Sequence, residues 1–148
     1  MRIYLDNCCY NRPFDDQRQE RIHMESEAVF AVLRRGIQQI DEIIGSSVLE
    51  LEIDGISNDA KKEKVKNLYK IVETSIQYTE KIYHRAEELS KQSNIRSFDR
   101  LHIASAEQGN VEMLLTTDDK LIKQCLNMDL TVKVMNPLNY IMEVFNNE

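Results

Sequence analysis

Short apolar runs alternate along the chain with longer segments in which apolar side chains recur every three or four positions. The runs at residues 2–6, 39–45, 111–115 and 130–135 have the length and apolar character of buried strands. A weaker strand is expected at residues 76–78. Because these strands alternate with helical segments, the pattern predicts an α/β fold with a mostly parallel central sheet of four to five strands.

The helical periodicity predicts helices at residues 17–36, 48–53, 59–72, 80–92, 98–108, 120–126 and 137–145. We expect Gly36 to end the first helix, and Pro137 to begin the last one. Serine and threonine side chains that suit helix N-caps precede three of the others, at Ser46 or Ser47, Thr79 and Ser97. Residues 7–16 are polar and contain turn-forming residues, so we expect a loop there.

The composition is that of a soluble globular protein. The chain has 148 residues, 42% of them hydrophobic and 30% charged, which suits a single domain spanning residues 1–148. Apolar runs stay far below the roughly 18 residues of a membrane span. The apolar stretch at the N-terminus is too short for a signal peptide. We therefore expect a cytoplasmic protein without a membrane-bound part.

Cysteine usage and net charge narrow the choice of chemistry. The three cysteines are Cys8, Cys9 and Cys125, an odd number that argues against a disulfide framework, and we interpret them as buried small residues. The net charge of −6 argues against a dedicated nucleic-acid-binding protein, which would show a basic surface. It does not argue against a metal-dependent nuclease, because bound metal reverses the local sign of a carboxylate cluster.

Four carboxylates lie at boundaries between predicted elements. Asp6 and Asp118 follow apolar strands, whose carboxyl ends meet at one edge of a parallel sheet. Glu52 and Asp99 lie near helix starts, close to strand ends. Each has a simpler interpretation, because Asp6 suits a turn, Asp118 suits a helix cap and Glu52 suits a solvated helix face. Asp99 suits the first turn of a helix, where the helix dipole favours a negative charge. Together they predict a site for Mg²⁺ or Mn²⁺, which prefer oxygen ligands.

Four segments resemble the PIN-domain family, a nuclease fold shared by many bacterial toxins of toxin–antitoxin pairs and by some RNA-processing nucleases. They are IYLDNCCYNRPFDD, GSSVLELE, SFDRLHIASA and LLTTDDKLI, and they occur in the family's order from residue 3 to residue 122. The first resembles a particular bacterial subgroup, and the others resemble the segments that hold the second, third and fourth acids. The resemblance implies a three-layer α/β/α PIN-like fold.

The resemblance also assigns site residues. Asp6 matches the first acid, Glu52 the second, Asp99 the third and Asp118 the fourth. Two neighbouring acids, Glu50 and Asp119, compete with Glu52 and Asp118 for their positions. Thr116 matches a small polar residue found beside the site, and Asn7 flanks the first acid.

The implied activity is metal-dependent hydrolysis of phosphodiester bonds, with RNA as substrate. The three aspartates would hold one or two Mg²⁺ or Mn²⁺ ions, and Glu52 would bind a second ion or orient the attacking water. Cationic side chains beside the motifs could contact phosphates, although each one alone is simply interpreted as surface charge: Arg12, Arg96, Arg100 and Lys120. We interpret His102 as a packed or capping histidine.

Other functions of acidic α/β sites fit this sequence less well or compete with nuclease activity. Phosphorelay receivers and haloacid-dehalogenase-type phosphatases fit poorly, since Lys120 is misplaced for the first and Cys8 stands where the second needs an aspartate. The stronger alternative is a catalytically silent PIN-like scaffold that binds RNA or a partner protein. Many relatives act with an antitoxin protein, which is a candidate partner. The charged residues 59–92 are interpreted as solvated, with a homodimer or partner surface as the alternative.

Overall fold

The computed structural model describes residues 1–147 and is built on a five-stranded sheet in which every pair of neighbouring strands is parallel. The strands are β1 (Arg2–Leu5), β2 (Glu42–Ser46), β3 (Thr74–Ile76), β4 (Met113–Leu115) and β5 (Lys133–Met135). Their order across the sheet is β3-β2-β1-β4-β5. The predicted α/β fold with a mostly parallel sheet of four to five strands is therefore confirmed.

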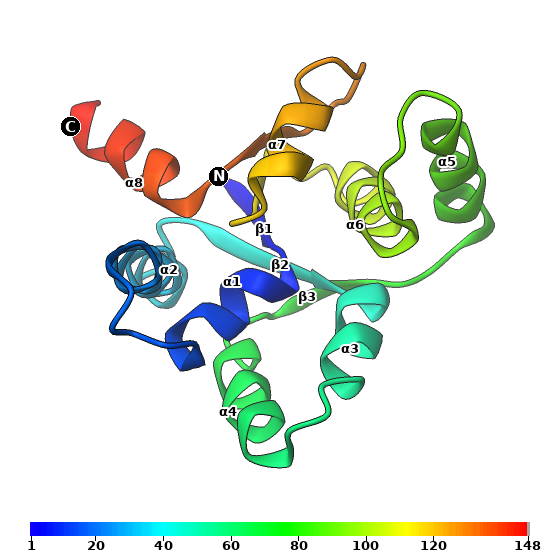
Figure 1. The fold of residues 1–148 in the computed structure, drawn as a ribbon. Coiled ribbons are helices and arrows are strands. Elements are labelled where there is room, and N and C mark those ends of the chain that lie inside the picture. The colour runs from blue at the N-terminus through cyan, green and yellow to red at the C-terminus, as the bar shows by residue number, and fades with distance from the viewer. Residues whose placement is uncertain (148) are drawn as a thin grey trace.

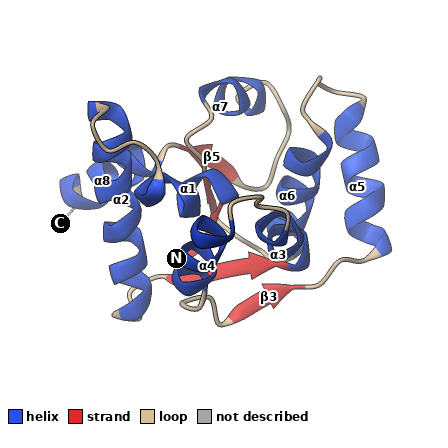
Figure 2. Ribbon diagram, turned by 60° about the horizontal axis from the view of Figure 1, so that its bottom comes forward, coloured by secondary structure: helices blue, strands red, loops and turns tan. Residues whose placement is uncertain are grey.

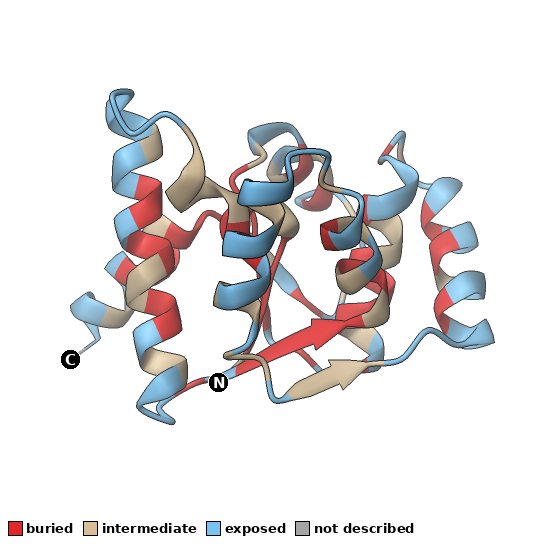
Figure 3. Ribbon diagram, turned by 90° about the horizontal axis from the view of Figure 1, so that it is seen from below, coloured by how far each residue is buried: buried red, intermediate tan, exposed pale blue. Residues whose placement is uncertain are grey.

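The central strand β1 is buried on both faces. Tyr4 pairs with Ile44 on one side and with Leu114 on the other, and Ile3, Tyr4 and Leu5 have no exposed surface. This explains the unbroken apolar run in the sequence, because a strand covered on both faces has no polar side to alternate with. The edge strand β3 is only half-buried (Figure 3), which accounts for its weaker sequence signal.

Helices cover both faces of the sheet and complete a three-layer α/β/α arrangement (Figure 1). Their bounds are α1 (Asn7–Asn11), α2 (Glu20–Ile37), α3 (Ser47–Asp54), α4 (Asp59–Tyr69), α5 (Glu80–Ser90), α6 (Ser97–Gln108), α7 (Asp119–Cys125) and α8 (Pro137–Asn146), with a 3₁₀ turn η1 (Arg12–Phe14) after α1. Helices α2 and α4 lie near Ile43 and Gly45, on one face of β2. Helix α6 lies on the opposite face, where α5 packs beside it (Figure 2).

The predicted loop at residues 7–16 is largely helical, because residues 7–14 form α1 and η1. The side chains of Cys9 and Tyr10 have no exposed surface, and the Tyr10 ring packs edge-on against Tyr69 of α4 at 5.6 Å between centroids. Asparagine, cysteine and tyrosine are weak helix formers, so tertiary burial rather than local propensity stabilises this short helix.

Two predicted helix ends also differ. Helix α2 continues past Gly36 to Ile37, and the residue with positive φ is Gln39, at 60°. Gly36 instead permits close packing, since a Cβ there would lie 2.6 Å from Cγ1 of Ile43. Helix α6 begins at Ser97, so the N-cap is Arg96 and no side chain fills that capping role. Ser46 and Thr79 do cap α3 and α5 as predicted, through Leu49 N and Ile82 N.

Candidate functional site

The strand order reverses direction between β1 and β4. Successive connections move from β1 to β2 and β3 on one side, and then return to β4 and β5 on the other side. In open parallel sheets the crevice outside the carboxyl ends of the strands at such a reversal is where ligands bind. Asp6 follows β1 directly and Asp118 lies three residues after the end of β4 (118 − 115), so both lie at this crevice.

Asp6 occupies the N-cap position of α1, but its carboxylate makes no capping hydrogen bond. The side chain is buried, with 7% of the residue exposed. Its Oδ2 accepts a hydrogen bond from Thr116 Oγ1 at 2.9 Å, and the Cys8 thiol lies 3.5 Å from the same oxygen. Thr116 Oγ1 also accepts from the backbone N–H of Asp118, and so links the first and fourth acids.

Glu52 reaches the crevice from α3. Helix α3 starts where β2 ends, because Ser46 Oγ accepts a hydrogen bond from Leu49 N. Glu52 Oε1 lies 2.9 Å from Nε2 of His102, and that nitrogen lies 4.0 Å from Asp6 Oδ1. One ligand atom each from Asp6, Glu52 and His102 lies within 4.8 Å of the others.

Asp99 belongs to the first turn of α6 and is 5% exposed. Its Oδ2 accepts a hydrogen bond from Arg96 Nε at 3.1 Å. Burial raises the pKa of Asp99, the charge of Asp6 raises it further, and the nearby Arg96 only partly opposes both. The two carboxylates therefore repel each other in the metal-free protein, which is the electrostatic state expected of a cation site.

Asp118 combines the two roles that the sequence left open. Its Oδ1 caps α7 by accepting hydrogen bonds from the backbone N–H groups of Lys120 and Leu121, at 3.0 and 3.2 Å. Its Oδ2 is free of the cap and lies 3.9 Å from Arg96 Nη2. One oxygen thus fixes the side chain to the helix, while the other belongs to the acidic crevice.

The four carboxylates line one cavity of about 380 Å³. Its walls are formed by Asp6, Asn7, Cys8, Asn11, Asp15, Glu52, Lys61, Arg96, Asp99 and Asp118. We call it the acidic pocket. The structure therefore brings together the four acids predicted from separate segments of the sequence, together with Asn7.

Comparison with known families gives an independent assignment. The family model of the PIN domain matches residues 22–125, which is most of the chain. The chain belongs to the PIN-domain family. The matched segment contains Glu52, Asp99 and Asp118, and Asp6 precedes it. PIN domains are typically nucleases. Comparison with curated proteins found no match.

Solved structures share the fold of this PIN domain. VapBC2 from Rickettsia felis, bound to a DNA fragment from their promoter, aligns with a TM-score of 0.65 and 16% identity over 92% of this chain and 98% of that chain. FitAcB from Neisseria gonorrhoeae aligns with a TM-score of 0.60 and 19% identity, over 91% of this chain and 97% of that chain. VapBC-1 from nontypeable Haemophilus influenzae aligns with a TM-score of 0.58 and 16% identity, over 93% of this chain and 98% of that chain. At such identities the likeness establishes the fold alone.

The structure separates the competing acids of this PIN domain. Glu50 points away from the acidic pocket, because its Oε2 accepts hydrogen bonds from Tyr69 Oη at 2.6 Å and from Ser75 Oγ at 2.5 Å. Asp119 lies on the surface and forms a bidentate pair with Arg21, at 2.7 Å for both bonds. The phase of each helix decides the outcome, since neighbouring helical residues point in different directions.

The predicted phosphate-binding cations have different surroundings. Arg12 and Arg100 are used internally, Arg12 in an ion pair with buried Glu25 and Arg100 in a hydrogen bond to the carbonyl of Ile95. Lys120 is exposed and lies outside the lining of the acidic pocket. Of the cations suggested by the sequence, Arg96 alone lines the acidic pocket, with 78% of its side chain exposed.

Sequence reasoning missed several residues of the pocket. Lys61 of α4 reaches it and pairs with Asp15 at 2.9 Å, and Cys8 contributes a half-buried thiol. The local sequence did not predict a place in the pocket for either residue, because Lys61 belongs to a segment rich in lysine and Cys8 was interpreted as a buried small residue. Position alone could have suggested Cys8, since it lies two residues after Asp6.

His102 is packed, as expected, but it also contacts the acids. Its side chain is 2% exposed and its Nδ1 lies 2.6 Å from Tyr4 Oη. Burial lowers the pKa of His102, but the hydrogen bond to Glu52 and the charges of Asp6 and Asp99 outweigh burial and raise it above the ordinary value. His102 therefore contacts the acids Glu52 and Asp6, which its interpretation as a packed histidine did not predict.

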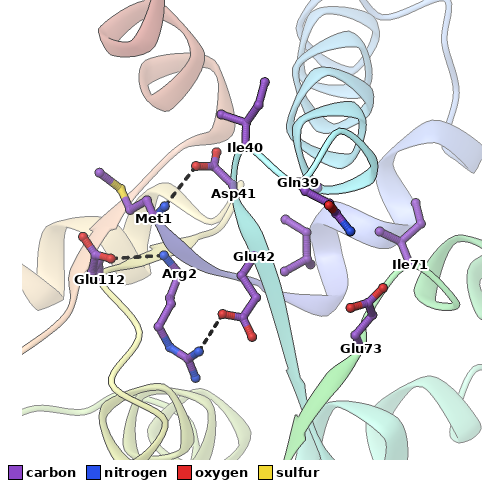
Figure 4. A pocket seen from close by; sticks show the side chains of 11 residues that line it. Met1, Arg2, Gln39, Ile40, Asp41, Glu42, Ile71, Glu73 and Glu112 are labelled. Atoms are coloured by element: carbon purple, nitrogen blue, oxygen red, sulfur yellow. Dashed lines mark hydrogen bonds and ion pairs between the residues drawn. The ribbon is translucent and has the colours of Figure 1, made fainter.

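A second cavity of about 270 Å³ lies at the other end of the sheet (Figure 4). Two ion pairs join charged groups of its lining, since the Met1 amino group lies 3.3 Å from Asp41 and the Arg2 guanidinium lies 2.7 Å from Glu42. The carboxylate of Glu112 accepts a hydrogen bond from the Arg2 backbone N–H. This cavity lies at the amino ends of β1 and β2, away from the crevice that holds the acids.

Among the described residues, the helices lack the combination of length and apolar character that crossing a membrane requires.

Proposed function

We propose that this PIN domain is a metal-dependent endoribonuclease that hydrolyses phosphodiester bonds in RNA. The observation that carries the proposal is the convergence of Asp6, Glu52, Asp99 and Asp118 on one pocket at the reversal point of the sheet. Four segments that are far apart in sequence supply these side chains. These carboxylates repel one another, and a bound cation would relieve the repulsion. In a chain of the PIN family, this favours a cation-dependent hydrolase over a binding scaffold.

The donor set suits Mg²⁺ or Mn²⁺. Both ions prefer hard oxygen ligands and are held by few carboxylates, and the pocket supplies oxygens from buried Asp6 and Asp99 together with one free oxygen of Asp118. We assign these three as the metal ligands and Glu52 as the residue that binds a second ion or orients water. When bound, the metal lowers the pKa of a coordinated water and stabilises charge on the phosphate.

The remaining pocket residues have supporting roles in this proposal. Thr116 and the cap at Asp118 hold two of the acids in place through the hydrogen bonds described above. The exposed side chain of Arg96 and the half-buried side chain of Lys61 supply positive charge at the pocket, where an RNA phosphate would approach. Asn7 lines the same wall beside Asp6.

The proposal is tested with paired variants. Asp118→Asn removes a carboxylate from the pocket, whereas Asp119→Asn removes its exposed neighbour, and the same contrast applies to Glu52→Gln and Glu50→Gln. We expect Asp118→Asn and Asp6→Asn to lower Mn²⁺-dependent cleavage of single-stranded and structured RNA by about 100-fold or more, and Asp119→Asn to leave it within about twofold. Unchanged cleavage in both Asp6→Asn and Asp118→Asn would refute the assignment of the acidic pocket as the catalytic site.

A silent scaffold would behave differently in a metal titration. A cation that binds only the folded pocket raises the midpoint of thermal unfolding by mass action. We expect Mn²⁺ to raise the midpoint of the unaltered protein, and to raise that of Asp119→Asn equally. A midpoint that does not respond to Mn²⁺ or Mg²⁺, combined with RNA binding and no cleavage, would support the scaffold instead.

We further propose that the protein is the toxin of a toxin–antitoxin pair and binds an antitoxin protein. The sequence resemblance to bacterial toxins supports this role, and so does the likeness of the fold to structures named VapBC2 and FitAcB. A short adjacent reading frame encoding a DNA-binding protein that co-purifies with this chain and suppresses its nuclease activity would support the pairing. A gene neighbourhood without such a frame would count against it.

We also propose that residues 1–148 act as one PIN domain in the cytoplasm. A homodimer is the remaining proposal on assembly, and analytical ultracentrifugation of the purified chain decides it. Residues 59–92, which include α4 and α5, present mainly exposed side chains outside a few buried positions such as Val65 and Ile82. A charge-reversed surface variant in this segment should leave sedimentation unchanged if the segment is simply solvated.

A further inference from the structure

His102 places a ring nitrogen between two acids of the pocket. Its Nε2 lies 2.9 Å from Glu52 Oε1 and 4.0 Å from Asp6 Oδ1. His102 follows Asp99 by three residues on α6, so both side chains project from the same side of that helix. The imidazole is almost entirely buried, which leaves its orientation to specific contacts rather than to solvent.

The other ring nitrogen is held in place by a hydrogen-bonded chain. His102 Nδ1 lies 2.6 Å from the hydroxyl of Tyr4, and that hydroxyl lies 2.6 Å from Ser46 Oγ. Ser46 Oγ in turn accepts from Leu49 N in the first turn of α3, the helix that carries Glu52. The chain therefore ties the imidazole to the strand that precedes Asp6 and to the helix that bears Glu52.

This arrangement is typical of histidines that bind metal. A metal-binding imidazole usually has its second nitrogen fixed by a hydrogen-bonding group, which sets the orientation of the ring. In this protein the fixed nitrogen faces the buried Tyr4 hydroxyl, and the other nitrogen faces two carboxylates. A hydrogen bond from His102 to Glu52 needs only one carboxylate near Nε2. The presence of a second carboxylate, that of Asp6, near the same nitrogen therefore points to a bound cation.

We propose that His102 Nε2, Glu52 and Asp6 form a second metal position in the acidic pocket, next to the one supplied by Asp6, Asp99 and Asp118. The proposal rests on the proposed metal-dependent function and adds a nitrogen ligand to it. Oxygen ligands suit Mg²⁺, whereas imidazole favours transition metals such as Zn²⁺, and affinity rises from Mn²⁺ across the series. The second position is therefore selective for Mn²⁺ or Zn²⁺ over Mg²⁺.

The test uses Mn²⁺ as a paramagnetic probe with the full chain. Isothermal titration calorimetry counts the bound ions, and electron spin echo envelope modulation detects nitrogen bonded directly to Mn²⁺. We expect nitrogen coupling in the unaltered protein at saturating Mn²⁺. We expect His102→Gln to lose this coupling and to weaken one Mn²⁺ site by about tenfold or more, while binding at the oxygen site persists. His84→Gln, which changes a histidine that packs edge-on against Tyr83, is the matched control and should keep the coupling.

A second variant keeps the inference testable if the buried substitution His102→Gln prevents folding. Tyr4→Phe removes the hydroxyl that orients the ring but keeps the imidazole, so we expect nitrogen coupling to remain and the affinity of that site to fall by about tenfold. Bound Mn²⁺ without nitrogen coupling in the unaltered protein overturns this inference and leaves the proposed nuclease standing. Coupling that survives His102→Gln or disappears in His84→Gln also overturns it. Absence of any Mn²⁺ binding overturns both.

Discussion

Replacing Arg12 by alanine separates a structural cation from one that binds substrate. Arg12 follows the first acidic motif and is a natural candidate for phosphate contact, yet its guanidinium is surrounded by protein groups. Nε lies 3.1 Å from Oε1 of fully buried Glu25, as an ion pair whose angle falls outside hydrogen-bond geometry. Its Nη atoms donate to Asp15 at 3.2 Å and to Thr117 at 2.8 Å. We therefore expect Arg12→Ala to act mainly on stability.

The magnitude follows from what remains around Glu25. Removing one partner of a buried ion pair costs about 3 to 5 kcal/mol, because the other charge stays buried. Glu25 keeps Asn136, which donates at 2.6 Å, and the more exposed Arg21 at 3.2 Å. These contacts place the cost of Arg12→Ala near the lower limit, at about 3 kcal/mol. For a domain of this size the midpoint of thermal unfolding should fall by roughly 6 to 12 °C.

A double-mutant cycle in urea measures this cost. In a Glu25→Gln background the buried charge is gone, so Arg12→Ala should cost only about 1 kcal/mol, which gives a coupling energy of about 2 kcal/mol. Lys120→Ala is the control cation beside the site and should change stability by less than about 0.5 kcal/mol. If Arg12→Ala costs no more than Lys120→Ala while RNA cleavage falls sharply, Arg12 binds substrate and the reasoning is refuted.

Three further predictions concern the pocket and its support. Asp99→Asn should raise the metal-free unfolding midpoint, because Asp99 is buried beside Asp6. It should also remove the part of the Mn²⁺ stabilisation that the position formed by Asp6, Asp99 and Asp118 supplies, about 2.7 kcal/mol at about 100 times the dissociation constant of that position, as differential scanning fluorimetry can measure. Gly45→Ala should cost about 2 kcal/mol in urea denaturation, since its Cβ would overlap the ring of Tyr69; a cost near zero would contradict this packing. Burial raises the pKa of Asp41, but hydrogen bonds led by that from Arg35 outweigh burial and lower it below the usual value of about 3.9. Asp41→Asn should therefore cost about 2 kcal/mol above pH 5, a difference that vanishes as the pH falls through the lowered pKa; a pH-independent difference would argue against a charge effect.

Local patterns predicted most of the secondary structure. Apolar runs located β1 and β4, because strands buried on both faces have no alternation to interrupt them. Helix starts at Ser46 and Thr79 followed from side chains that accept backbone N–H groups within the same turn. The prediction of a loop at residues 7–11 was wrong because the helix there does not depend on local sequence. Burial of Cys9 and Tyr10 against distant parts of the chain stabilises a helix that its own residues do not favour.

The sequence by itself determined the order of the elements and the four segments that carry the acids. That information is local, and the rule that parallel strands end at one edge extends it to the meeting of Asp6 with Asp118. Only the tertiary structure decided which neighbouring acid enters the pocket, that Arg12 is committed to Glu25, and that His102 faces Glu52. The physical reason is that helix phase and burial depend on packing partners that lie far away in the sequence.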